Sequence, residues 1–353
     1  MNKKLFPALG ATLIALGFLN SANVSLRAAD GPYHLIKEIP VGDEGGWDYL
    51  SVDAGGRRLY IAHATKVLVL DLDKDQVVGE ITNTPGVHGF AIAPELNRGF
   101  ASNGRENKAS IVDLKTLQTL SQVDTGLNPD AILFEPAHQE VYTFNGRGQS
   151  TTVFDANSGK VLATVKLPGK PEFAVCDTNV GRLYNNIEDQ NVVVVLDTKT
   201  HQLVNTWPIA PGEEASGLAF DQAHHRLFLG CGNQRMVMMD STSGKVVDSV
   251  PIGEGVDANS FDPATQLAFA SCGGSGTVTI AHEDSPEKLT VVQTLKTERG
   301  ARTMTLDPKT HRIYLASARY EVSAPAAAGA RPQRPKMVPG SFKVLVYGMD
   351  KVE

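Results

Sequence analysis

The sequence predicts an all-β protein with the architecture of a seven-bladed β-propeller, and three observations support this prediction. First, one short phrase recurs seven times at intervals of about 40 to 45 residues, which is the period of a propeller blade. Second, each unit contains four short apolar or alternating runs of strand length, separated by Gly, Asn, Asp and Pro turn residues. Third, four-stranded sheets stacked around an axis leave few exposed edges, which favours a closed ring over an open sandwich.

The recurring phrase is a polar turn followed by an apolar strand, as in DPKTHRIYLAS from Asp307 to Ser317. The aromatic residue of this strand falls at Tyr60, Phe100, Tyr142, Tyr184, Phe228, Phe269 and Tyr314. Seven residues upstream, the turn opens at Asp53, Ala93, Glu135, Asp177, Asp221, Asp262 and Asp307. We expect the turn carboxylates to bond their own backbone and the aromatic rings to fill the space between blades. The phrase therefore builds the fold and sets the register of the repeats.

The four strands of each unit follow in a fixed order. The first strands read YLSV, GFAI, AILF, FAVC, GLAF, ANSF and TMTL, and the second strands carry the recurring phrase. Third strands are apolar runs that end in Asp, at Asp71, Asp113, Asp155, Asp197 and Asp240. Fourth strands follow turns such as NSGK. The seventh unit ends after its third strand, at residues 342–348, and residues 34–42 form a strand that belongs to no other unit. We therefore predict that the N-terminal strand closes the last blade.

Residues 1–29 have the layout of a secretory signal peptide. The basic start MNKK precedes the apolar run FPALGATLIALGFL and a small-residue cleavage site. We expect cleavage after Ala29, a periplasmic or secreted location, and a single propeller domain over residues 30–353 with no membrane span. The alternative is a retained membrane anchor, for which the apolar run is short.

The last unit contains a Pro/Ala-rich insertion at about residues 320–341, between its second and third strands. The insertion is basic, with Arg331, Arg334 and Lys336. A long loop without strand pattern inside a compact domain is typical of a lid, a partner-binding arm or a disordered insert. These three interpretations stay open.

The charge of the chain limits its partners. The formal net charge is −6, and removal of residues 1–29, which contain Lys3, Lys4 and Arg27 and no acid, makes it about −9. A net acidic protein is poorly suited to general binding of the nucleic-acid backbone. We expect a monomer that binds a small molecule or a protein segment.

A column of unlike polar residues lies five residues before each turn-opening residue, where the register places the mouth of the central channel. Its members are Asp48, His88, Asp130, Glu172, Ser216, Asp257 and Arg302. Polar groups that converge at a concave mouth indicate ligand binding. Crowded carboxylates shift each other's pKa, so they could act as acid or base or bind a divalent cation, and no other cofactor is evident. The alternative is a water-filled channel with a hydrophilic lining.

Residues next to the column extend the candidate site. Trp47 could stack on a ligand or fill the gap beside the first blade. Loops between second and third strands place a mostly cationic and amide rim around the mouth: His63, Asn103, Arg105, Asn145, Arg147, Asn233 and Arg235. A cationic rim above an anionic throat suits a zwitterionic or polyhydroxylated ligand.

Two other features lack the pattern that their chemistry requires. His224 and His225 lie on a turn at the opposite face and belong to no HExxH or CxxC motif, so the sequence assigns them no zinc. Cys231 and Cys272 share a register in neighbouring blades, where the Cα atoms are usually too far apart for a disulfide. We expect two free thiols, with a bridge as the alternative.

The phrase Asp-Pro-x-x-x-Arg-ϕ-Tyr, followed by an apolar strand ending in Asp and an NSGK-type turn, resembles the YVTN/YncE-like seven-bladed propellers over residues 34–348. This resemblance implies an extracytoplasmic protein. Lactonase-like propellers lie near that family, and one of its branches binds DNA.

Three functions follow from these observations. We expect a ligand- or partner-binding module that acts through the channel mouth. The alternative is a lactonase-like hydrolase, in which His88 or Glu172 is the general base and Arg302 stabilises the developing oxyanion. The second alternative is a DNA-binding propeller, which the resemblance alone implies and the acidic charge opposes.

Overall fold

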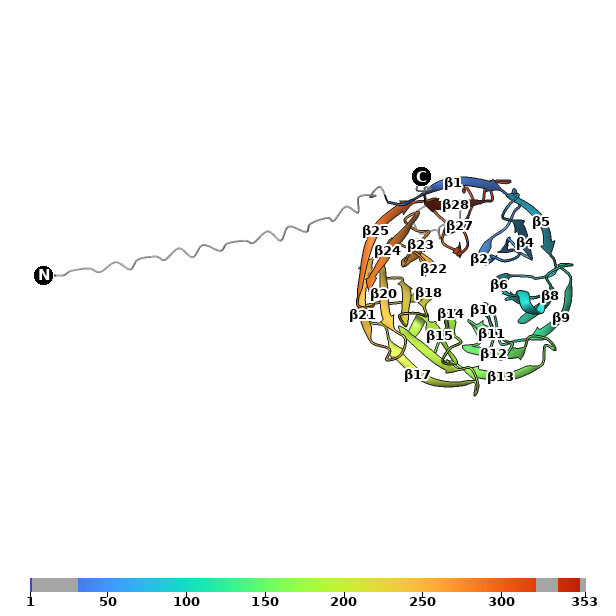
Figure 1. Ribbon diagram of the computed structural model, residues 1–353, viewed down its shortest axis with the longest axis horizontal. Helices are drawn as coiled ribbons and strands as arrows, with labels where there is room; N and C mark the ends of the chain where they lie inside the picture. The colour runs from blue at the N-terminus through green and yellow to red at the C-terminus, as the bar shows by residue number, and fades with distance from the viewer. Residues whose placement is uncertain (2–30, 322–335, 350–353) are drawn as a thin grey trace.

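The computed structural model describes residues 1, 31–321 and 336–349, which form seven four-stranded antiparallel sheets in a ring (Figure 1). This confirms the predicted all-β, seven-bladed propeller. The helical elements among the described residues are two short 3-10 turns, η1 (Pro94–Leu96) and η2 (Glu188–Gln190).

Blades are numbered here in chain order, and the first four are continuous in sequence. Blade 1 comprises β2 (Trp47–Asp53), β3 (Arg58–His63), β4 (Lys66–Asp71) and β5 (Gln76–Ile81). Blade 2 comprises β6 (Val87–Ala93), β7 (Arg98–Asn103), β8 (Lys108–Asp113) and β9 (Thr119–Asp124). Blade 3 comprises β10 (Pro129–Glu135), β11 (Glu140–Asn145), β12 (Ser150–Asp155) and β13 (Val161–Lys166). Blade 4 comprises β14 (Pro171–Asp177), β15 (Arg182–Ile187), β16 (Val192–Asp197) and β17 (Gln202–Pro208).

The last three blades include the one that joins the two ends of the chain. Blade 5 comprises β18 (Ala215–Asp221), β19 (Arg226–Cys231), β20 (Arg235–Asp240) and β21 (Val246–Pro251). Blade 6 comprises β22 (Val256–Asp262), β23 (Leu267–Cys272), β24 (Thr277–Ser285) and β25 (Lys288–Lys296). Blade 7 comprises β26 (Met304–Asp307), β27 (Arg312–Ser317), β28 (Lys343–Met349) and β1 (Tyr33–Pro40).

The first strand of every blade lies at the centre of the ring and the fourth strand at its circumference (Figure 1). Each inner strand contacts the inner strands of both neighbouring blades, from β2 and β6 round to β26, which contacts β2 again. The ring is therefore closed, and the starts of seven strands surround one central channel.

Strand β1 completes blade 7, as the orphan strand of the sequence predicted. It pairs antiparallel with β28, with Ile39 opposite Val344, and the sheet order is β1-β28-β27-β26. Ile39 is 2% exposed and packs in the apolar cluster between blades 7 and 1. The two ends of the chain are thus held together by one sheet.

The recurring phrase serves the packing between blades. All seven of its aromatic residues are at most 2% exposed. In the last copy, Tyr314 packs against blade 1, while the carboxylate of Asp307 accepts a hydrogen bond from the backbone N–H of Lys309. The same carboxylate accepts a second bond, of 2.7 Å, from Arg57 of blade 1. The expected structural role of the phrase is confirmed.

Several sequence predictions concern segments near the ends and the insertion. The signal peptide predicted over residues 1–29 falls, apart from residue 1, outside the described residues, as do residues 322–335 of the insertion. At the base of the insertion, Tyr320 and Met337 form an isolated antiparallel bridge. Cys231 and Cys272 are buried free thiols. Over the described ranges, no helix has the length and apolarity needed to cross a membrane.

Candidate ligand-binding site at the channel mouth

The polar column lies at the start of the inner strands. Asp48, for example, is the second residue of β2, and His88 is the second residue of β6. In blades 1 to 6 the pairing of the inner strand with its neighbour is irregular around this position, as between Trp47 and Leu50 in blade 1. Such bulges change the direction of a side chain relative to a regular ladder. The repeat therefore provides both the position of each column residue and the irregular backbone that presents it to the channel.

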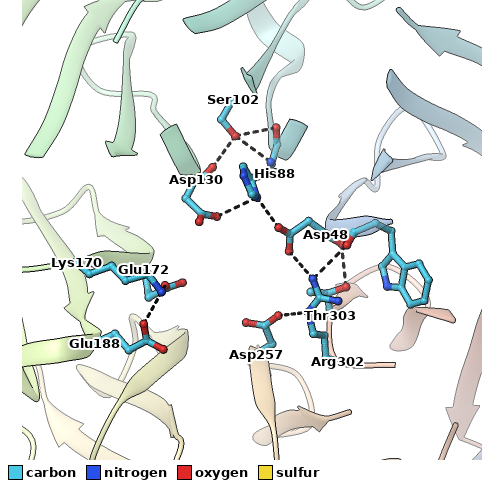
Figure 2. Close-up of polar contacts among 12 residues, drawn as sticks. Asp48, His88, Ser102, Asp130, Lys170, Glu172, Glu188, Asp257, Arg302 and Thr303 are labelled. Carbon is cyan, nitrogen blue, oxygen red and sulfur yellow. Dashed lines mark hydrogen bonds and ion pairs between the residues drawn. The ribbon is translucent and has the colours of Figure 1, made fainter. Parts of the chain in front are cut away.

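Five of the seven column residues form one continuous polar network across blades 6, 7, 1, 2 and 3 (Figure 2). Nδ1 of His88 lies 2.7 Å from Oδ2 of Asp48 and 3.6 Å from Oδ1 of Asp130. Nε of Arg302 donates to Oδ2 of Asp257 at 2.6 Å, and its Nη2 lies 3.5 Å from Oδ1 of Asp48. Asp48 thus joins the histidine and arginine halves of the network.

Glu172 belongs to a second, smaller group. Nζ of Lys170 lies 2.5 Å from Oε1 of Glu172 and 2.5 Å from Oε2 of Glu188 (Figure 2). Glu172 is 6% exposed, whereas the side chain of Lys170 is 44% exposed, so the carboxylate is shielded from water and the lysine is not. Lys170 was not among the residues predicted for the site, although a lysine two residues before a column carboxylate was a usable signal.

Ser216 does not join either group. Its hydroxyl donates to the backbone carbonyl of Val256 in the next blade at 3.0 Å, and its side chain is buried. This bond links blades 5 and 6, and the ligand contact expected of Ser216 stays a prediction. A serine hydroxyl is a donor short enough to be satisfied by the backbone of the adjacent strand.

A cavity of about 940 Å³ opens above blades 1 to 3 at this mouth. Asp48, His88 and Arg302 line it directly. Gly104, in the loop after β7, also lines it, and a Cβ on this glycine would lie 2.7 Å from Nε2 of His88. The histidine therefore occupies its place only because this loop carries no side chain there.

The rim differs in part from the prediction. Arg105 and Arg147 line the cavity, as expected for a cationic rim. His63, Asn103 and Asn145 are fully buried. Both asparagines bond side chains of their own blade, as Asn103 does with Ser110, so they shape the loops from within. The prediction that these three residues form the rim is wrong, because the two asparagines satisfy the interior of their own blades and the ring of His63 packs against Phe342, with centroids 4.5 Å apart.

Trp47 lies beside the cavity but is mainly a core residue. It is 5% exposed, and its ring centroid lies 5.2 Å from that of Phe342 and 6.4 Å from that of Tyr320. Its position favours the packing alternative over direct stacking on a ligand.

Two aromatic rings form a floor beneath the network. Tyr49 of blade 1 and Phe173 of blade 4 meet edge to face with centroids 5.2 Å apart, although their blades lie on different sides of the channel. The residue after the column is otherwise small or Thr303: Gly89, Ala131, Gly217 and Ala258. This contrast of two large residues among small ones is a signal for the floor that the sequence carries.

Burial and mutual repulsion shape the charge of the mouth. Burial is the main cause that raises the pKa of Asp130 to about 6, the pKa of Asp257 to about 6 and the pKa of Glu172 to about 8. Neighbouring carboxylates add to each of these shifts. Burial lowers the pKa of His88, but the hydrogen bond that its ring donates to Asp48 and the charge of Asp130 outweigh this effect, so the pKa is raised. A positive charge placed here would stabilise the ionised carboxylates.

The same geometry could hold a metal ion. Asp48, His88 and Asp130 each offer one ligand atom, and these atoms lie within 4.8 Å of one another. Carboxylate oxygens and an imidazole nitrogen are ligands for several divalent cations. The divalent cation considered from the sequence therefore has three donors available at the mouth.

Comparison with known proteins gives the fold and no more. No protein-family profile matches the chain, and no curated protein matches it. A solved structure of Kuenenia stuttgartiensis hydrazine synthase superposes with a TM-score of 0.67 at 16% sequence identity, covering 85% of this chain and 96% of that one. At this identity the likeness establishes the propeller architecture alone. The resemblance to the YVTN/YncE-like family stays a prediction.

Proposed function

We propose that this chain is an extracytoplasmic binding propeller that takes a small polar ligand with a positively charged group in the mouth of its channel. The observation that carries the proposal is the Asp257–Arg302–Asp48–His88–Asp130 network, which contributes three residues to the wall of the cavity. The extracytoplasmic part of the proposal rests on the signal-peptide layout of residues 1–29.

The balance of charge in the network favours a cationic group. Three carboxylates share one guanidinium and one imidazole, and the raised pKa of Asp130 and of Asp257 means that their negative charge is poorly compensated. A ligand ammonium would supply that compensation in a partly buried site, where charge interactions are strong. Arg105 and Arg147 at the rim would attract an anionic end of the same ligand.

The test is a binding screen by calorimetry at low salt and pH 7. The probes are free amino acids, glycine betaine, putrescine and spermidine, with Ca²⁺, Mn²⁺ and Zn²⁺ as separate arms. The double variant Asp48→Asn/Asp130→Asn should lower the affinity for a positive probe at least about tenfold, because each hydrogen bond to a charged group contributes about 1.5–3 kcal/mol.

The matched control is Asp124→Asn. This carboxylate ends β9 at the circumference, and its side chain is 88% exposed. It should leave the affinity unchanged. Equal affinities of the wild type and the double variant for every probe that binds would show that the mouth network is not the ligand site.

Hydrolysis is a second candidate, and one observation favours it. The contact between Nδ1 of His88 and Asp48 orients the ring as a carboxylate orients the base in many hydrolases, and Nε2 then faces the loop that lines the cavity. Glu172, the other base considered, is paired with Lys170, so His88 is the better candidate. A screen of lactones and simple esters tests this function, with His88→Gln expected to abolish any turnover. Turnover that survives this substitution would exclude His88 as the base.

A further inference from the structure

A second cluster of metal-ligating side chains lies away from the mouth, at the boundary of blades 5 and 6. Asp221 ends β18, His224 follows it in the turn before β19, and Glu283 lies near the end of β24. Each offers one ligand atom, and these atoms lie within 4.8 Å of one another. The three residues come from two different blades, so the cluster exists only in the folded ring.

Glu283 is the unusual member of the cluster. Its side chain is 1% exposed, and neither of its carboxylate oxygens has a hydrogen-bond partner among the described residues. A buried carboxylate without a partner is strongly unfavourable, so its position requires a compensating positive group. Asp221, itself 3% exposed, adds a second buried carboxylate at the same place.

The contacts of His224 indicate a shared third partner. Its Nδ1 lies 2.6 Å from Oδ2 of Asp221 and 3.5 Å from Oε1 of Glu283, yet neither contact has hydrogen-bond alignment at Nδ1. Ligands around a metal ion are arranged in this way: their donor atoms lie close together but point at the ion and not at each other.

Two other blade boundaries satisfy the equivalent carboxylate in a different way. Asp307 accepts a hydrogen bond from Arg57, and Asp262 lies within hydrogen-bond distance of His311. In both cases the basic residue belongs to the next blade and stands four positions after the residue that opens the turn there. Blade 6 has Gln266 at that position, which carries no charge, and it brings the carboxylate of Glu283 to the boundary instead. This boundary therefore lacks the basic residue that its two counterparts have.

Arg226, which begins β19 directly after the turn of His224, is already engaged. Nη1 of Arg226 donates to Asp240 at 2.6 Å and to the carbonyls of His224 and His225, and its Nε donates to the carbonyl of Pro286. These bonds hold the turn that carries His224. Because they occupy the guanidinium of Arg226, the charge of Asp221 and Glu283 must be balanced by another cation.

We propose that Asp221, His224 and Glu283 bind one divalent transition-metal ion, best matched by Zn²⁺, which joins blades 5 and 6. Two carboxylates and a neutral imidazole balance the charge of such an ion, and mixed oxygen and nitrogen donors suit zinc. Bonds of about 2.1 Å require ligand atoms about 3.4 Å apart. The contact of His224 with Glu283, at 3.5 Å, already has this length, and the contact with Asp221, at 2.6 Å, would lengthen by a small side-chain rotation. His224, with its side chain 35% exposed, provides the route by which the ion enters.

The experiment uses the purified chain after treatment with a chelator. Asp48→Asn is introduced throughout, to weaken zinc binding at the channel mouth. Calorimetric titration with Zn²⁺ should show one site per chain, confirmed by metal content after gel filtration. Adding Glu283→Gln should lower the affinity more than about 100-fold, because even outer-shell partners of metal sites contribute 10–100-fold.

A matched pair of variants on the exposed turn guards against misfolding. His224→Asn should abolish the zinc site and the rise in melting temperature that Zn²⁺ produces, while His225→Asn should keep both. His225 lies in the same turn but outside the cluster, and asparagine tolerates its positive φ of 58°.

The competing occupant is a proton. Without an ion, burial and the neighbouring Asp221 raise the pKa of Glu283 to about 7, so a protonated pair is the simplest alternative. If the Asp48→Asn protein binds no Zn²⁺, or binds it equally well with Glu283→Gln or His224→Asn, the cluster is such a pair and the metal site is excluded.

Discussion

At the scale of single residues, the channel mouth combines four titratable groups whose pKa values are all raised. The pKa values of Asp130, Glu172 and Asp257 are raised by burial, and that of His88 is raised by its carboxylate neighbours. Each group therefore binds more protons in the folded than in the unfolded state over the range between its ordinary and its raised pKa, and for the three carboxylates together this range extends from about pH 4 to pH 8. By linkage, their contribution to stability falls as the pH rises through this window. A ligand cation would oppose that loss.

Glu172→Gln tests this linkage. Glutamine cannot ionise, so the variant lacks the cost of a buried carboxylate that is incurred as the pH approaches the raised pKa of about 8. We expect the unfolding free energy of the variant relative to wild type to increase by about 1–3 kcal/mol from pH 5 to pH 8. Urea unfolding at both pH values measures it. A difference that is constant with pH would show that Glu172 keeps an ordinary pKa.

Gly104→Ala tests the position of His88. A Cβ at this position would lie 2.7 Å from Nε2, whereas a Cβ at Gly46, which also lines the cavity, meets nothing within 4 Å. The first substitution should displace the ring from Asp48 and lower the pKa of His88, because that hydrogen bond raises it. Titration of His88 by NMR measures the shift, and Gly46→Ala should leave the titration curve in place. Equal curves for all three proteins would contradict the geometry.

At the scale of elements, the short strand β1 closes the ring. It supplies the outer strand of blade 7 from the opposite end of the chain, and it contributes Ile39 to the cluster between blades 7 and 1. The sequence predicted this closure because one strand was missing at one end and one was left over at the other.

Ile39→Ala should destabilise the protein by about 2–4 kcal/mol, since truncation of a buried isoleucine removes packing and leaves a cavity. Ile36→Ala, on the same strand but 36% exposed, is the matched control and should cost clearly less. Thermal and urea unfolding compare the two. Similar losses would mean that burial of β1 against blade 1 does not secure the ring.

At the scale of the whole molecule, the formal net charge of −6 favours binding of small cations and disfavours binding of nucleic acid. The arginines at the mouth, Arg105, Arg147 and Arg302, surround a throat that is rich in carboxylates. Phosphate backbones need clustered cations with few nearby acids. The DNA-binding alternative therefore has charge against it at both the local and the global level.

A mobility-shift assay with a 30-base-pair duplex at micromolar protein tests this conclusion. We expect no shift at 20 mM salt, where non-specific electrostatic binding is strongest. A shift that disappears with added salt would restore the nucleic-acid alternative.

The sequence by itself determined the seven blades, their strand order, the closure by β1 and the position of the polar column. These features repeat with a period of one blade, and local strand patterns and turn residues are sufficient to set them. Only the tertiary structure decided which side chains meet. Asp48 joins Arg302 and His88 from two other blades, Ser216 is satisfied by the backbone, and Glu172 pairs with Lys170.

The same holds for Asp221, His224 and Glu283. Sequence reasoning set His224 aside for want of a zinc motif, because Glu283 lies on a different blade and about sixty residues away along the chain. Contacts between blades depend on how whole sheets stack and on the irregular pairing at the start of each inner strand. A repeat of about forty residues specifies neither of these features. The positions of the column residues could therefore be predicted from the sequence, but the contacts between them could be seen only in the closed ring.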